Sequence, residues 1–190
     1  MDKYVGFLSS NKKYLTMVSL LLAVLIGLAM ATQWSILGSL GRERGSLQIA
    51  WFSGLTTLSV LGLLVVANRV FSGTDYSAFN SIVRYEWLII ITLVGSIGLV
   101  TVANNLPWWS FCSGLFGLAL IVGAAYLVPR IGVAEFFVAV TLGSAIGGVI
   151  LDHIGAFGNP TTLFSPLRIL GLLAIMLGVL LVRIGNFWQE

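Results

Sequence analysis

The length of its uncharged segments constrains this chain more than any other feature. Forty-three consecutive residues, 87–129, carry no charged side chain, and 28 more, 14–41, follow Lys13 without one. A helix rises about 1.5 Å per residue, so the longer segment as one helix would measure about 64 Å. The hydrocarbon core of a bilayer is only about 30 Å thick. The longer segment must therefore fold back on itself.

The composition also indicates an integral membrane protein. The 190 residues include ten basic and seven acidic side chains, so 9% are charged, while 58% are hydrophobic. Soluble domains carry about 25% charged residues. So few charges cannot cover the surface of a soluble fold, which excludes a cytosolic enzyme, a nucleic-acid-binding protein and a disordered chain. The net charge of +3 then indicates membrane orientation rather than nucleic-acid binding.

The sequence predicts an all-α, polytopic integral membrane helix bundle with six spans. The break in the longest segment falls at 104–107, Asn-Asn-Leu-Pro, because Asn tolerates turn conformations and Pro fits the first position of a helix. Residues 1–13 are expected at the membrane interface, ahead of a single transmembrane bundle over 14–190. Its predicted spans are 14–40, 46–68, 87–103, 107–128, 133–151 and 166–184. If 87–103 does not cross, the count is five.

The distribution of positive charge favours six spans. With the N-terminus in the cytoplasm, the inner segments of a six-span chain hold seven of the ten Lys and Arg residues, and with five spans they hold six. Cytoplasmic segments of membrane proteins carry an excess of Lys and Arg. The predicted interface anchors are Arg42, Trp108, Trp109, Arg168 and Arg183.

Small residues recur at a spacing that favours close helix packing. Ala139, Gly143 and Gly147 are four residues apart and therefore share one helix face, where a neighbouring backbone can approach. The spacing leaves open whether the neighbouring helix belongs to the same chain or to another copy.

Glu135 is the most informative single residue, because it lies inside a predicted span. A carboxylate within a membrane helix is costly and is by default a functional hypothesis. Glu135 could exchange protons in a transport cycle. The alternative places it one turn inside the interface, paired with Arg130 or reaching lipid headgroups.

Four further polar or aromatic residues are weaker candidates. Gln33, Trp34 and Asn104 could line a polar, aromatic pocket, although Asn104 is also typical of a turn. Asp152 could act with His153 in a proton relay, although the adjacent glycines favour a loop at a helix end. No metal-binding constellation, cofactor motif, phosphate-binding loop or nucleophile motif is recognisable, so neither a metal nor a cofactor nor an enzyme is expected.

Several motifs, taken in order and spacing, resemble those of a known family. They are Pro-Trp-Trp (107–109), Gly-Leu-Phe-Gly (114–117), Val-Pro-Arg-Ile-Gly-Val-Ala (128–134), Ile-Leu-Asp-His-Ile-Gly-Ala-Phe-Gly (150–158) and Ser-Pro-Leu-Arg-Ile-Leu-Gly (165–171). The chain resembles the YdcZ-like family, a branch of the drug/metabolite transporter superfamily classed as inner-membrane exporters. The resemblance covers roughly 140 residues. The chain departs from it by the apolar segment 87–103 and by Leu37, Ser39 and Gly143 at positions that tend to be polar.

The resemblance implies a multi-pass protein of the bacterial inner membrane that exports a small molecule. Proton coupling through Glu135 is a separate hypothesis, which follows from the position of this carboxylate and not from the resemblance. The expected partners are the lipid bilayer and either a second copy in a homodimer or other membrane subunits, and not nucleic acid. The substrate is not encoded in any motif. The alternative function is a non-transporting subunit of a larger membrane complex, since the lost polar positions suit lateral packing.

Overall fold

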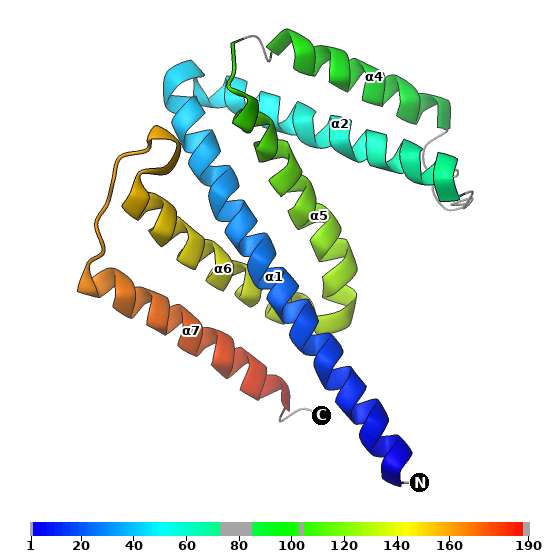
Figure 1. Cartoon of the computed structure of the whole chain (residues 1–190), viewed down its shortest axis with the longest axis vertical. Coiled ribbons are helices and arrows are strands. Elements are labelled where there is room, and N and C mark those ends of the chain that lie inside the picture. The colour runs from blue at the N-terminus through cyan, green and yellow to red at the C-terminus, as the bar shows by residue number, and fades with distance from the viewer. Residues whose placement is uncertain (1, 73–84, 103–104, 188–190) are drawn as a thin grey trace. The chain divides into compact units, whose positions relative to one another are not determined.

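The protein is all-helical in the part of the chain that the computed structural model describes, residues 2–72, 85–102 and 105–187 (Figure 1). Its six α-helices there are α1 (Asp2–Arg44), α2 (Ser46–Ser72), α4 (Tyr85–Val102), α5 (Cys112–Ile131), α6 (Val133–Ile154) and α7 (Pro166–Phe187). Two 3-10 turns, η1 (Trp108–Phe111) and η2 (Ala156–Gly158), precede α5 and follow α6. The predicted all-α fold class is confirmed.

Helices occupy all six of the predicted spans. Within the described residues, four helical stretches are long and apolar enough to cross a membrane: Tyr14–Arg44, Ser46–Asn68, Trp108–Ile131 and Val133–Ile154. The apolar parts of α4 and α7 are shorter, 89–100 and 166–182. The crossing of 87–103 and the single bundle over 14–190 stay predictions. The expected interfacial segment 1–13 is helical from Asp2 onward, as the beginning of α1.

The helix boundary at Pro107 differs from the prediction. Pro107 is not the first residue of an α-helix: its backbone is extended (φ −63°, ψ 147°), and a 3-10 turn separates it from α5. Helix α5 ends at Ile131, three residues beyond the predicted span 107–128, because Pro129 removes a backbone donor only in the last turn. Helix α7 begins at Pro166, the first residue of the predicted span 166–184, and the backbone N–H of Arg168 donates to the Ser165 hydroxyl (3.3 Å).

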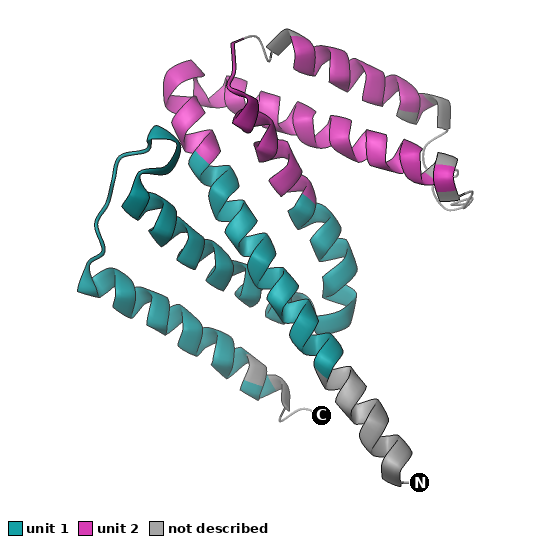
Figure 2. Ribbon diagram, in the orientation of Figure 1, with its two compact units in different colours: residues 1–35, 119–190 teal, residues 36–118 magenta. Residues whose placement is uncertain are grey.

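The chain divides into two compact units, coloured separately in Figure 2. Unit 1 comprises residues 1–35 and 119–190, and unit 2 comprises residues 36–118. Unit 1 therefore holds the first part of α1, most of α5, and all of α6 and α7. Its buried apolar cluster consists of Ala23, Leu127, Ile131, Phe136 and Ala139.

Helices α1 and α6 approach each other closely within unit 1. A Cβ atom added at Gly27 would overlap the carbonyl oxygen of Val140, and one added at Gly143 would overlap the carbonyl oxygen of Val24. Glycine lets two helix backbones come into direct contact in this way. On its other side, α6 packs against α7.

Unit 2 is built around the packing of α2 against α4. Gly62 of α2 faces the side chain of Thr92, and a Cβ there would overlap the Thr92 hydroxyl. Thr57 also ties α2 to the start of α5, because its hydroxyl donates to the carbonyl oxygen of Gly114 (3.1 Å). Unit 2 also buries several small side chains that carry a hydroxyl group: Ser39, Ser53, Thr56, Ser59, Thr92, Ser110 and Ser113.

Candidate functional site

A sharp turn between α5 and α6 determines the position of Glu135. Gly132 joins the two helices with φ 85° and ψ 160°, a backbone conformation that glycine adopts without steric cost. Its N–H donates to the carbonyl oxygen of Val128 (2.8 Å), and its carbonyl oxygen accepts from the N–H of Phe136 (3.2 Å). Glu135 therefore falls in the first turn of α6, where an acidic side chain interacts favourably with the positive end of the helix dipole.

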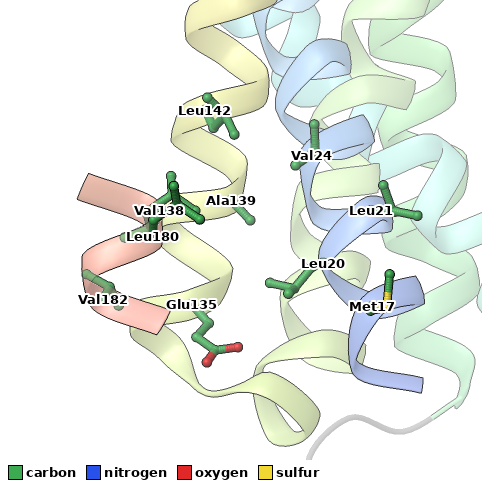
Figure 3. A pocket seen from close by; sticks show the side chains of 11 residues that line it. Met17, Leu20, Leu21, Val24, Glu135, Val138, Ala139, Leu142, Leu180 and Val182 are labelled. Atoms are coloured by element: carbon green, nitrogen blue, oxygen red, sulfur yellow. The ribbon is translucent and has the colours of Figure 1, made fainter. Parts of the chain in front are cut away.

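Glu135 and Phe136 take opposite roles in this turn. Phe136 is buried in the apolar cluster of unit 1, whereas Glu135 is half-buried and faces a groove between three helices of the same unit. Figure 3 shows the carboxylate at one end of the groove, with apolar side chains along the rest. The lining residues are Met17, Leu20, Leu21 and Val24 of α1, Glu135, Val138, Ala139 and Leu142 of α6, and Val179, Leu180 and Val182 of α7.

Among the described residues, the groove combines apolar walls with one ionisable group. Its volume is about 390 Å³, and Glu135 is the charged one of the eleven described residues that line it. Binding sites for small molecules are of this size and are mostly apolar, with a few polar groups that fix orientation. Met17, Leu21 and Leu180 are more than half exposed, so the groove is open along its apolar side. It can therefore hold an apolar molecule whose polar or cationic part lies against the carboxylate.

The other candidates in unit 1 are not brought to this groove. Gln33 and Trp34 follow each other in α1 but face different directions, since Gln33 is 9% exposed and Trp34 is 54% exposed. Asp152 lies at the far end of α6, where its carboxylate forms an ion pair with Arg168 (3.4 Å). Asp152 lies in the last turn of α6 and not in a loop, and its ion pair connects α6 with α7. Arg183 belongs to α7 and lies outside the described side chains.

The remaining candidates belong to unit 2. Asn104 lies outside the described residues, but its neighbour Asn105 has φ 66°, as expected of a turn, and its carbonyl oxygen accepts a hydrogen bond from Arg44 (3.1 Å). Arg42 is exposed in the last turn of α1. Trp108 is 80% exposed and Trp109 is half-buried, both in η1. Their placement at a membrane interface stays a prediction.

The small residues of α6 meet α1 of the same chain. Ala139 is part of the buried cluster, Gly143 faces Val24 and Gly27, and a Cβ at Gly147 would lie 2.8 Å from that of Ala31. The spacing did not tell whether the helix on this face of α6 comes from the same chain or from another copy. The structure shows that it is α1 of the same chain.

Sequence reasoning missed two features of unit 1. The α7 wall of the groove consists of Val179, Leu180 and Val182, which carry no signal because α7 is apolar on most of its surface. Asn159 was also missed: its amide donates to the backbone and hydroxyl oxygens of Ser35 (both 2.8 Å) and to the carbonyl oxygen of Ala156 (2.9 Å). An Asn-Pro pair after a Gly-bearing turn was the available signal.

Comparison with known proteins agrees with the resemblance described above. A family model described as "Putative inner membrane exporter, YdcZ" matches residues 18–181, a range that includes the whole groove except Met17 and Val182. No curated protein and no solved structure matches the chain. The family is one of membrane exporters rather than of enzymes. The chain, a multi-pass membrane protein, therefore belongs to the YdcZ family of inner-membrane exporters.

Proposed function

We propose that the chain exports a small molecule that binds in the groove of unit 1, and that Glu135 couples this export to protons. One observation carries the proposal: the carboxylate of Glu135 lies at one end of a groove whose other described lining residues are apolar. Ionisable groups within membrane-spanning helices are costly, and those that are kept mark substrate or proton pathways.

The coupling follows from competition for one carboxylate. A proton and a cationic group of the substrate both neutralise Glu135, so each excludes the other from the same oxygen atoms. If the groove faces the two sides of the membrane in turn, substrate leaves when a proton replaces it, and the proton leaves when new substrate binds. The apolar side chains of α1, α6 and α7 in the groove contribute binding free energy to the substrate.

The assembly that we propose is a homodimer, with the N-terminus in the cytoplasm. Many transporters are built from two structural repeats. One chain, with six helices in its described residues, would correspond to one repeat of such a transporter, and a second copy would correspond to the other repeat.

A second candidate function is a non-transporting subunit of a larger membrane complex. The observation in its favour is the outer surface of α7, where Leu167, Leu170, Leu177 and Leu181 are 60% exposed or more. An apolar helix that packs on α6 and exposes these leucines can serve for lateral association with another membrane protein.

Proteoliposomes test the first function directly. The purified chain is reconstituted with a pH-sensitive dye inside the vesicles, and tetraethylammonium is added as a probe cation on one side. We expect proton movement opposite to the cation in the wild type and its loss in Glu135→Gln, which keeps the size of the side chain but cannot ionise. Glu43→Gln is the matched control, because Glu43 is exposed near the end of α1 and is not a lining residue of the groove.

Two results would decide against the proposal. Proton-coupled transport that persists in Glu135→Gln would exclude Glu135 as the coupling residue. Absence of transport from the wild type with every probe cation, together with stoichiometric co-purification of other membrane proteins from native membranes, would favour the subunit function.

A further inference from the structure

A second groove of unit 1 lies between α1 and α5 and shares no described lining residue with the groove beside Glu135. Its volume is about 380 Å³. Its walls include Leu22, Leu25 and Ala29 of α1 and Ala119, Val122 and Tyr126 of α5. Leu25 and Tyr126 are more than half exposed, so the groove is open to the outside of the unit.

Ile26 of α1 and Gly123 of α5 meet within this groove. A Cβ atom added at Gly123 would overlap the terminal methyl group of Ile26. Ala119 and Gly123 have the four-residue spacing that lets a helix of another chain approach, but that approach needs the glycine face to be free. Here Ile26 of the same chain already occupies the space beside Gly123. The groove therefore suits a narrow apolar chain better than a second helix.

An exposed arginine lies next to one end of the groove. Arg130 follows Tyr126 by one helical turn, and its guanidinium lies over the Tyr126 ring, with Cζ 3.4 Å from the ring centroid. It also donates to the backbone carbonyl oxygen of Tyr126. Among the described residues, no carboxylate pairs with Arg130, whereas Arg168 pairs with Asp152. The guanidinium is therefore accessible to an anion from outside the protein.

The position of the groove along the chain indicates what surrounds it. Both walls belong to helical stretches that are long and apolar enough to cross a membrane, Tyr14–Arg44 and Trp108–Ile131. In a bilayer, apolar side chains of such stretches contact acyl chains. Arg130 lies one residue before the end of α5, and an arginine at the end of a spanning helix reaches the level of the lipid phosphates.

We propose that the α1–α5 groove binds an acyl chain of an anionic phospholipid, whose phosphate lies against Arg130. Lipid tails are as apolar as leucine, so the walls of the groove fit the chain without choosing among headgroups. The choice comes from the guanidinium, which favours a headgroup with net negative charge. The Tyr126 ring keeps the guanidinium beside the groove through a cation–π interaction.

Lipid-dependent thermal stability of the full chain tests the role of Arg130. The purified protein in neutral detergent is titrated with phosphatidylglycerol or phosphatidylcholine, and we expect phosphatidylglycerol to raise the melting temperature more. Arg130→Gln should raise the half-saturating concentration of phosphatidylglycerol about tenfold, as the loss of one charged hydrogen bond predicts. Arg44→Gln is the matched control, because Arg44 is also exposed at a helix end but lines neither groove. Equal effects of the two variants would overturn the proposal.

A variant that fills the groove tests the role of the apolar walls. Ala119→Phe leaves Arg130 in place and should remove the difference between phosphatidylglycerol and phosphatidylcholine. Ala174→Phe is the matched control, because it makes the same change at an exposed position of α7 that lines neither groove. If the difference persists in Ala119→Phe, the headgroup binds without the groove and the acyl-chain assignment is wrong.

Photocrosslinking of the wild type identifies the occupant even if Ala119→Phe does not fold. Phosphatidylglycerol with a diazirine in one acyl chain should label residues 22–29 and 119–127, and unlabelled phosphatidylglycerol should compete better than phosphatidylcholine. Labelling spread evenly over the helices would overturn the proposal. So would stabilisation by glycerol phosphate equal to that by phosphatidylglycerol, since glycerol phosphate has no acyl chain. Crosslinks between two copies through these residues would show that a second chain occupies the groove.

Discussion

The close contacts of α1 with α6 in unit 1 and of α2 with α4 in unit 2 depend on glycine in different ways. Opposite Gly143 lies the backbone of α1, namely the carbonyl oxygen of Val24 and the α-carbon of Gly27. Opposite Gly62 lies a side chain, that of Thr92. A side chain can be shortened by a second substitution, whereas a backbone atom cannot be removed.

This difference has a consequence for the candidate site. The backbones of α1 and α6 touch, and these two helices form two walls of the groove. A change of side-chain rotamer therefore cannot alter the distance between these walls. The third wall, from α7, belongs to a helix whose apolar residues are mostly exposed. The groove beside Glu135 is therefore bounded on one side by a close backbone contact and on the other by a loosely packed helix.

The largest expected effect is that of Gly143→Val. The added atoms would overlap the backbone of α1, and we expect a loss of about 3 kcal/mol in the free energy of unfolding, measured by denaturant titration in mixed micelles. Gly148→Val, with no atom within 4 Å of its added Cβ, is the control on the same helix and should change stability little. A Gly143 variant as stable as the wild type would contradict the described contact.

The next effect is that of Gly62→Ala, which we expect to cost about 2 kcal/mol because its Cβ would overlap Thr92. Thr92→Ala should rescue part of this loss by removing the hydroxyl and methyl groups. A double-mutant cycle on unfolding free energies measures the coupling, which should be about 1 kcal/mol in the favourable direction. Zero coupling would mean that the two residues do not meet, and the comparison between the units would fail.

The smallest effect is that of Thr57→Val, which keeps the shape of the side chain and removes its hydroxyl. This hydroxyl donates to the carbonyl oxygens of Gly114 (3.1 Å) and Ser53 (2.9 Å). Hydrogen bonds between helices in membranes contribute about 0.6 kcal/mol on average, and we expect a loss of that size. A loss above about 2 kcal/mol would indicate that the hydroxyl groups of unit 2 act as one network rather than as separate contacts.

Much of the helical framework was predictable from local signals. The uncharged segments predicted where helices occur, and the predicted span 166–184 begins at the first residue of α7. The 3-10 turn after Pro107 was not predictable, because the same proline is compatible with an extended residue and with a first helical residue.

The candidate site was predictable only in part. Glu135 stood out because it is a charged residue inside an apolar segment. Its neighbours in the groove did not stand out, since α1, α6 and α7 are apolar on several faces and such helices carry no marker of which face packs. Asp152 was expected as a candidate for proton transfer. Its ion pair with Arg168 was not predictable, because it depends on the path of the chain between Gly155 at the end of α6 and the beginning of α7.

The sequence by itself determined the class of protein, the sites of its helices and the resemblance to its family, because charge and hydropathy act locally along the chain. Only the tertiary structure decided that Gly143 meets α1, that Glu135 opens into a three-helix groove, and that Arg168 pairs with Asp152. These facts depend on steric fit between segments distant in the sequence, and residues of similar hydropathy do not encode which of them will touch.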